Sequence, residues 1–219
     1  MKKKAMALVL ALGLVVVGIV GGTMAWLTAE ATKVENVFTD SDINITLTES
    51  DTDRIEDGDQ HNYKMIPGHT ITKDPKVTVA AGSEDCWLFV KITESTEPDL
   101  DAYIAYAIAT GWKTVQAEDA LGVTVIGRKV LKDDVTKSFD ILGTGEYPVG
   151  GTETYTWGPN AVLTKPEVTK EMMDAIDDET EAKPTLTFQA AAVQLYETQV
   201  KEFDVATAYA KVAWSTGNS

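Results

Sequence analysis

The sequence predicts an all-β fold, an antiparallel β-sandwich of about ten short strands with a few short helices at its edges. Apolar and polar residues alternate over short segments, of which residues 43–48 are the clearest. Pairs such as Pro67-Gly68 and Gly158-Pro159 separate these segments, as turns do. With 219 residues, 44% hydrophobic and 24% charged, the chain has enough apolar content for one packed domain, which we place at residues 41–214.

The expected strands follow one another through this domain. Residues 86–93 are largely apolar on both faces, which predicts a central strand with a packed, unreactive thiol at Cys86. Residues 82–85 predict the turn before that strand. The full set of expected strands is 43–48, 63–66, 70–73, 76–80, 86–93, 112–115, 123–131, 139–142, 152–157, 161–163 and 185–196.

Acidic residues crowd the stretch from 49 to 60, which predicts a loop between two strands. The acidic positions around Gly58 are Asp51, Asp53, Glu56, Asp57 and Asp59. Their spacing differs from that of a calcium-binding EF-hand loop, because the twelfth position counted from Asp53 is Lys64 and not a glutamate. A solvated loop is therefore favoured, and a weak cation site is the alternative.

Three segments carry helical spacing. Residues 99–109 have Asp99 as a candidate N-cap and Gly111 as a candidate stop, although the same residues also fit a strand. Residues 167–176 follow Pro166, which suits a first turn, and residues 202–214 predict a closing helix. We expect residues 97–121 to be an insertion at one end of a sheet and residues 215–219 to be a flexible tail.

The first 25 residues have the pattern of a signal-peptide helix. Three lysines precede an uncharged apolar run from residue 5 to 20, and Gly21-Gly22 would end the helix. Thr23 and Ala25 are small residues at the two places that a signal peptidase requires, which predicts cleavage before Trp26. The alternative is an uncleaved anchor, because the run approaches the roughly 20 apolar residues that span a bilayer. Cleavage would make the protein secreted, in the extracellular matrix or at the cell surface.

Charge and motif content narrow the function classes. The net charge of −15 argues against nucleic acid as a partner and predicts a solvated acidic face, with a cation-binding surface as the alternative. The single cysteine excludes an internal disulfide, which in an exported protein fits a bacterial source. His61 and His69 match no zinc motif, and the chain has no nucleophile elbow or phosphate loop. We therefore expect no catalytic residue, no metal and no cofactor.

Four stretches, taken in chain order, resemble a known family. They are Gly-Gly-Thr-Met-Ala-Trp-Leu-Thr at 21–28, Val34-x-Asn36-x-Phe38-Thr39, the proline-glycine segment with its Asp-Pro-x-Val-x-Val strand at 65–79, and Leu-Thr-Phe-Gln-Ala-Ala-Ala-Val-Gln at 186–194. Together they are similar to the TasA/camelysin (CalY) family, whose signal peptides are cut by the dedicated signal peptidase SipW. The resemblance runs along most of the chain, and its specificity lies in the combination of motifs.

The resemblance implies a jelly-roll form of the β-sandwich and a structural function in the bacterial biofilm matrix. It implies filaments in which the segment from Trp26 to about Asp40 leaves its own subunit and adds as a strand to the next one. The candidate anchors of this donor strand are Trp26, Leu27, Val34, Val37 and Phe38. The implied partners are other copies of the chain, the SipW-type peptidase during export, and an anchoring or accessory matrix protein. The alternatives are a monomeric cell-surface accessory protein of the same fold and a camelysin-like secreted metallo-endopeptidase.

Overall fold

The computed structural model describes residues 42–50, 54–57, 60–151, 153–176 and 182–214, and leaves the side chains of residues 54–57 and 60–62 undescribed. All of these residues belong to one compact unit, Ser41–Ser219. The expected signal peptide (1–25), the N-terminal segment (26–40) and the tail (215–219) lie outside the described residues.

The unit is built mainly from antiparallel strands with few helices, which confirms the all-β prediction. One sheet has four strands in the order β14 (Leu186–Gln194), β6 (Cys86–Glu94), β9 (Val123–Val130) and β8 (Lys113–Gln116). Val90 stands opposite Ala190 on one side and Ile126 on the other. Strand β6 is therefore internal to the sheet, as its apolar faces predict.

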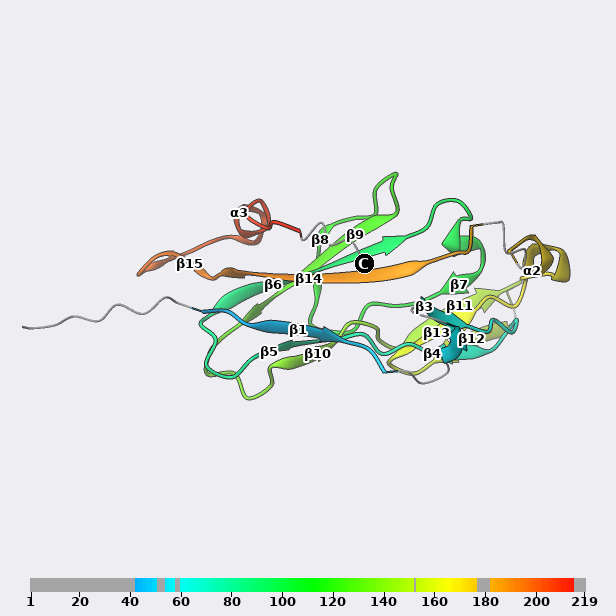
Figure 1. Cartoon of the computed structure of the whole chain (residues 1–219), viewed down its shortest axis with the longest axis horizontal. Coiled ribbons are helices and arrows are strands. Elements are labelled where there is room, and N and C mark those ends of the chain that lie inside the picture. Colours follow the sequence, from blue (N-terminus) through cyan, green and yellow to red (C-terminus); the bar gives the residue numbers. More distant parts are fainter. Residues whose placement is uncertain (1–41, 51–53, 58–59, 152, 177–181, 215–219) are drawn as a thin grey trace, which may run out of the picture. The chain divides into compact units, whose positions relative to one another are not determined.

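Two three-stranded sheets form the second layer (Figure 1). The first joins β1 (Ile45–Thr48), β5 (Lys76–Val79) and β10 (Ser138–Asp140). The second joins β4 (Thr70–Thr72), β13 (Ala161–Thr164) and β7 (Ile104–Ala105). Most of these pairings join strands that are distant in the sequence, so the layer holds together segments from the whole described chain.

Apolar side chains form a core on each face of the four-stranded sheet. The larger core lies between the layers and includes Leu88, Val90 and Ile92 from β6. The smaller core lies on the outer face, where Phe89 packs with Phe203 and Ala208 beneath helix α3 (Val205–Tyr209). Cys86 is fully buried, and burial raises the pKa of its thiol to about 11, which keeps it protonated and unreactive at neutral pH.

The prediction of a loop at 49–60 is wrong, because most of this stretch forms a β-hairpin. Strand β2 (Arg54–Asp57) pairs with β3 (Gln60–Tyr63), and the two residues between them are Gly58-Asp59. A two-residue Gly-Asp connection between two strands is a hairpin signal, which the crowding of acids obscured. The strand expected at 63–66 is also wrong, since β3 ends at Tyr63.

The helix expected at 99–109 is wrong beyond its first turn. Asp99 does cap it, accepting from the backbone N–H of Asp101 at 3.1 Å, but the helix is the 3-10 turn η1 (Leu100–Ala102). Ile104 then enters β7 and pairs with Thr164. Residues 97–121, expected as an insertion, supply β7 to one sheet and β8 to another.

The other helices are shorter than expected, and two hairpins were missed. Helix α2 (Lys170–Ile176) begins after Thr169, whose hydroxyl accepts from the N–H of Met172 at 3.3 Å. Helix α3 begins after Asp204, which accepts from the N–H of Thr207 at 2.9 Å. The missed hairpins join β11 (Gly145–Val149) to β12 (Glu153–Trp157) and β15 (Tyr196–Thr198) to β16 (Lys201–Glu202).

Candidate functional site

Two strand edges of the sandwich lie side by side without pairing. Strand β1 is bonded to β5 on one side, and β14 is bonded to β6 on one side. No strand of the described chain pairs with the other side of either one. Cα atoms of β1 and β14 approach within 8 Å, and Figure 1 shows the two strands running beside each other. We call this place the β1–β14 seam. Exposed strand edges carry unpaired backbone donors and acceptors, so they are templates for a further strand.

Partly exposed apolar side chains line the seam. Ile45 from β1 and Phe188, Ala190 and Ala192 from β14 pack against the main core while remaining partly accessible. Alanine side chains add little bulk beyond the backbone. An incoming strand would therefore meet both a bonding edge and apolar surface, which is what strand addition requires.

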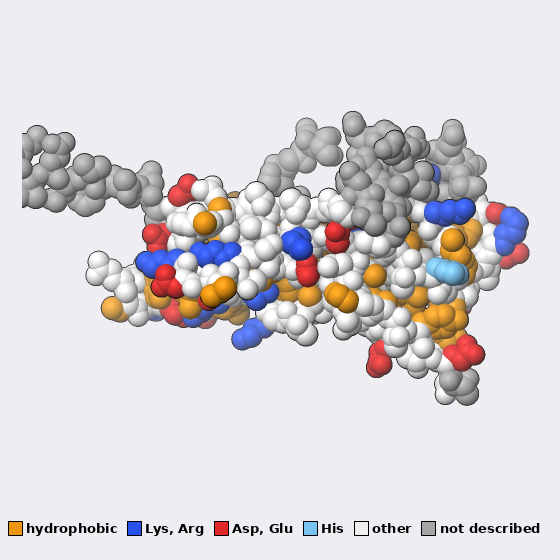
Figure 2. Space-filling model, turned by 90° about the horizontal axis from the view of Figure 1, so that it is seen from below, with side chains coloured by type: hydrophobic (Ala, Val, Ile, Leu, Met, Phe, Trp, Pro, Cys, Tyr) orange, Lys and Arg blue, Asp and Glu red, His pale blue; other side chains and the backbone are white. Residues whose placement is uncertain are grey.

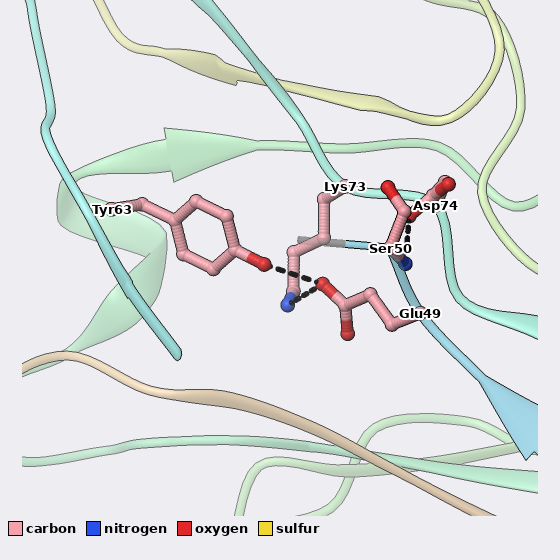
Figure 3. Close-up of polar contacts among 5 residues, drawn as sticks. All are labelled: Glu49, Ser50, Tyr63, Lys73 and Asp74. Atoms are coloured by element: carbon pink, nitrogen blue, oxygen red, sulfur yellow. Dashed lines mark hydrogen bonds and ion pairs between the residues drawn. The ribbon is translucent and has the colours of Figure 1, made fainter. Parts of the chain in front are cut away.

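A buried ion pair stands at one end of the seam (Figure 3). Lys73 Nζ lies 2.7 Å from Glu49 Oε1, and the Tyr63 hydroxyl donates to the same oxygen at 2.7 Å. The side chains of Lys73 and Glu49 are only 9% and 18% exposed. The ammonium also lies 4.9 Å from the centroid of the Tyr63 ring and 5.6 Å from that of Phe188. Lys73 therefore links β1, β3 and β14.

A second contact lies beside the ion pair, between the residues that follow Glu49 and Lys73 in the sequence. The backbone N–H of Ser50 donates to Asp74 Oδ1 at 2.8 Å (Figure 3). The two residues that follow β1 are thus held by the two residues that follow β4. We call the Glu49–Lys73 pair with this hydrogen bond the clasp. It ties the end of β1 to the end of β4.

Glu94 and Tyr106 form a second buried polar pair, at the end of β6. Glu94 is 8% exposed and accepts a hydrogen bond from the Tyr106 hydroxyl. Burial raises the pKa of Glu94 above its usual value, and the tyrosine hydrogen bond offsets part of this shift. Nearby carboxylates raise the pKa further; they belong to Asp101, Glu118 and Asp99.

We expect the Glu94→Gln variant to be more stable than the parent protein at neutral pH. Because the folded-state pKa is raised, the folded protein binds more protons than the unfolded one, and stability is lost as pH rises through the folded pKa. A glutamine does not ionise, so it removes this loss of stability, and its side-chain oxygen can still accept the hydrogen bond from the Tyr106 hydroxyl. Denaturation with urea from about pH 4 to about pH 7 measures the difference. The stability difference between variant and parent should be small at about pH 4 and grow toward about pH 7. A difference that does not depend on pH would contradict a raised pKa of Glu94.

The described residues contain no group of three or more His, Cys, Asp or Glu placed to hold a metal ion. His69 is exposed beside the Pro67-Gly68 turn, and the side chain of His61 lies outside what the structure describes. Figure 2 shows acidic and basic side chains intermixed on one face, with apolar side chains gathered toward the end where β4 and β12 lie. Within the described residues, no helix is long and apolar enough to cross a membrane.

The structure does not place the site residues predicted from the sequence. The cleavage-site residues Thr23, Ala25 and Trp26 and the donor-strand anchors Trp26, Leu27, Val34, Val37 and Phe38 lie outside the described residues. The seam and the clasp were not foreseen. The only sequence signal for them is the run of alanines at 190–192 in a strand otherwise suited to a core.

Comparisons of the chain with known protein families, with curated proteins and with solved structures found no match.

Proposed function

We propose that the protein is a secreted structural component of a bacterial biofilm matrix, which assembles into filaments by donating residues 26–40 of one copy to the β1–β14 seam of the next. The observation that carries this proposal is the seam itself, where two strand edges lie beside each other without pairing and carry an apolar lining. The resemblance to the TasA/camelysin family supports it, including the jelly-roll description of the two layers and export through a SipW-type peptidase.

The physics of assembly is strand addition. Backbone hydrogen bonds from the donated strand supply affinity, and alternate apolar side chains facing the sandwich set its register. The anchors would be Trp26, Leu27, Val34, Val37 and Phe38. A contact between the front of one copy and the seam of another does not close on itself, so it propagates as a fibre.

The donated segment starts from a defined place. Asp42 accepts from the N–H of Glu84 and Asn44 donates to Ser83, so the chain enters β1 beside the turn between β5 and β6. Residues 26–40 would span roughly 50 Å when extended. This length is sufficient to cross to a neighbouring copy.

The seam must widen to accept the donated strand. Neighbouring strands lie about 4.8 Å apart, so a strand bonded to both edges would separate β1 from β14 by roughly 9.6 Å. Cα atoms of the two strands now approach within 8 Å. A shift of β1 by at least about 2 Å is therefore part of assembly, and we expect the clasp to resist it.

Deletion of residues 26–33 from the mature chain tests the proposal. The mature chain should form filaments visible by electron microscopy, and the deletion variant should elute as a monomer in size-exclusion chromatography. Replacing Val37 and Phe38 by glutamate should have the same effect, while Glu35→Gln, a polar change in the same segment, should not. Filaments from the deletion variant would exclude strand donation. A mature chain that remains monomeric would favour the accessory-protein alternative.

A crosslinking experiment identifies the acceptor. One chain carries Val37→Cys and another carries Ala190→Cys, and the two are mixed under oxidising conditions. The native Cys86 does not compete, because it is fully buried and burial raises its pKa to about 11. We expect a disulfide-linked dimer only in the mixture. Val135→Cys, at a position fully exposed to solvent, replaces Ala190→Cys as the control and should give none.

A further inference from the structure

A cavity of about 320 Å³ opens on the side of the sandwich away from the seam. It is bordered by β10 and β9, which lie toward the edges opposite β1 and β14 in their sheets. Phe139 and Leu142 are its buried apolar residues. Three hydroxyl side chains stand at its exposed rim, those of Thr110, Ser138 and Thr144.

One wall of the cavity is the guanidinium of Arg128, one of only two arginines in the chain. Arg128 lies on the same face of β9 as Ile126 and Val130, which both belong to the core between the layers, so its side chain points into the sandwich. The guanidinium carbon lies 3.6 Å from the centroid of the Phe139 ring and 5.2 Å from that of Trp112. Stacking on these two aromatic faces holds the forked, planar guanidinium group of Arg128 in place.

Gly111 gives the guanidinium its room. A Cβ on this residue would stand 3.3 Å from Arg128 Nη2, and its φ of +91° is a backbone conformation that favours glycine. The chain is therefore shaped around the arginine. The sequence suggested Gly111 as the end of a helix, whereas in the structure it leaves space for the guanidinium of Arg128.

Arg128 has no acceptor in the described part of the chain. None of the described residues accepts a hydrogen bond from it or forms an ion pair with it, and its Nε is buried without a partner. Burial lowers the pKa of Arg128, yet a guanidinium remains charged at neutral pH. A half-buried cation with unused donors is costly unless an anion completes it.

The opposite wall offers an acceptor. Asp140 lines the same cavity, and its Oδ2 accepts no hydrogen bond from the described residues. Its other oxygen, Oδ1, forms an ion pair with Lys76 Nζ at 3.2 Å. The cavity thus combines a fork of donors, a carboxylate acceptor and hydroxyls that both donate and accept.

We propose that this cavity binds a sugar that carries a carboxylate, such as a uronic acid residue. The carboxylate pairs side by side with the two donors of the Arg128 fork. Ring hydroxyls donate to Asp140 and exchange hydrogen bonds with the rim hydroxyls. A neutral sugar leaves the arginine without an anion, and a simple carboxylate or phosphate supplies no hydroxyl to donate to Asp140 Oδ2. The cavity volume is at the lower end of the range for ligand pockets and suits a single ring.

Titration of the mature chain that carries Val37→Glu and Phe38→Glu, and is therefore expected to stay monomeric, with methyl glucuronide, followed by NMR, tests the site. Shifts should be confined to residues 108–111, 128 and 138–144. Methyl glucoside, acetate and inorganic phosphate serve as probes that each lack one half of the chemistry, and each should bind at least about tenfold more weakly. Equal binding of glucoside and glucuronide would overturn the proposal, as would shifts elsewhere or no binding at all. An oligoglucuronide that binds more tightly than the monomer identifies a polymer as the source, and equal affinity identifies the single residue.

Three single-residue variants distinguish specific recognition of the glucuronide carboxylate from a nonspecific effect of positive charge. Arg128→Lys keeps the charge but loses the fork, and we expect glucuronide binding to fall at least about tenfold. Asp140→Asn is a second variant on the opposite wall and should weaken glucuronide more than acetate. Lys132→Gln removes an exposed cation elsewhere and should leave binding unchanged. Thermal melts establish that each variant is folded, and a Lys132→Gln loss equal to that of Arg128→Lys would refute the assignment.

Discussion

Replacing Phe89 by alanine is expected to lower the free energy of unfolding by about 4 kcal/mol. The side chain is fully buried on the outer face of the central strand. Its ring lies 5.7 Å from that of Tyr209 and 6.3 Å from that of Trp87, measured between centroids. Removing it leaves a void beneath α3, which a segment of five helical residues cannot collapse to fill.

Urea denaturation of the variant measures this loss, with Leu121→Ala as the control. Leu121 is 74% exposed, so its truncation should change stability by less than about 0.5 kcal/mol. The Trp87 indole N–H donates to the carbonyl of Phe203 at 2.9 Å, so tryptophan fluorescence reports whether the C-terminal segment detaches. A loss below about 1 kcal/mol would mean that the outer cluster is not a second core.

The strand-rich fold could be predicted because its strongest signals are local. Strand β6 shows its two buried faces in its own composition, and β5 and β9 lie close to their expected bounds. The helix at 99–109 failed because its spacing fits two structures. Pairing of Ile104 with Thr164, sixty residues away, decided between them. The start of the closing helix was misplaced for a different reason, since the Asp204 cap fixes a start that spacing alone does not show.

The candidate site could not be predicted, because its contacts join residues distant in the sequence. Glu49 meets Lys73 only after β1 has paired with β5 and β4 with β13. The sequence showed Glu49 only as the first residue of an acidic stretch. Arg128 likewise gave no signal, since its isolation depends on which side chains fail to reach it. Edge position is a property of the sheet order, and single-strand patterns carry no information on it.

Replacing Lys73 by methionine is expected to lower the free energy of unfolding by about 3 kcal/mol, because it leaves a buried carboxylate without its cation. Glu49 would keep the hydrogen bond that it accepts from the Tyr63 hydroxyl. The matched control is Lys76→Met in the neighbouring strand. Its pair with Asp140 has side chains 46% and 38% exposed, so the loss there should stay below about 1 kcal/mol.

A double-mutant cycle isolates the pair. Glu49→Gln alone should also destabilise the protein, since it leaves the ammonium of Lys73 buried and unpaired. The double variant should lose less than the sum of the two single losses, because neither charge then remains uncompensated. Strict additivity would show that the two side chains do not interact and that the clasp is not a unit.

Loss of the clasp should lower the stability of the monomer and at the same time raise the rate of filament assembly. If the clasp holds β1 close to β14, the Lys73→Met variant should be less stable as a monomer yet form filaments faster than the parent chain. Hydrogen exchange at the β1 amides should accelerate, since those amides depend on the position of the strand. Lys76→Met should change neither rate. A destabilised variant that assembles more slowly would show instead that the clasp belongs to the filament contact, because a lost monomer contact alone can only ease the opening of the seam.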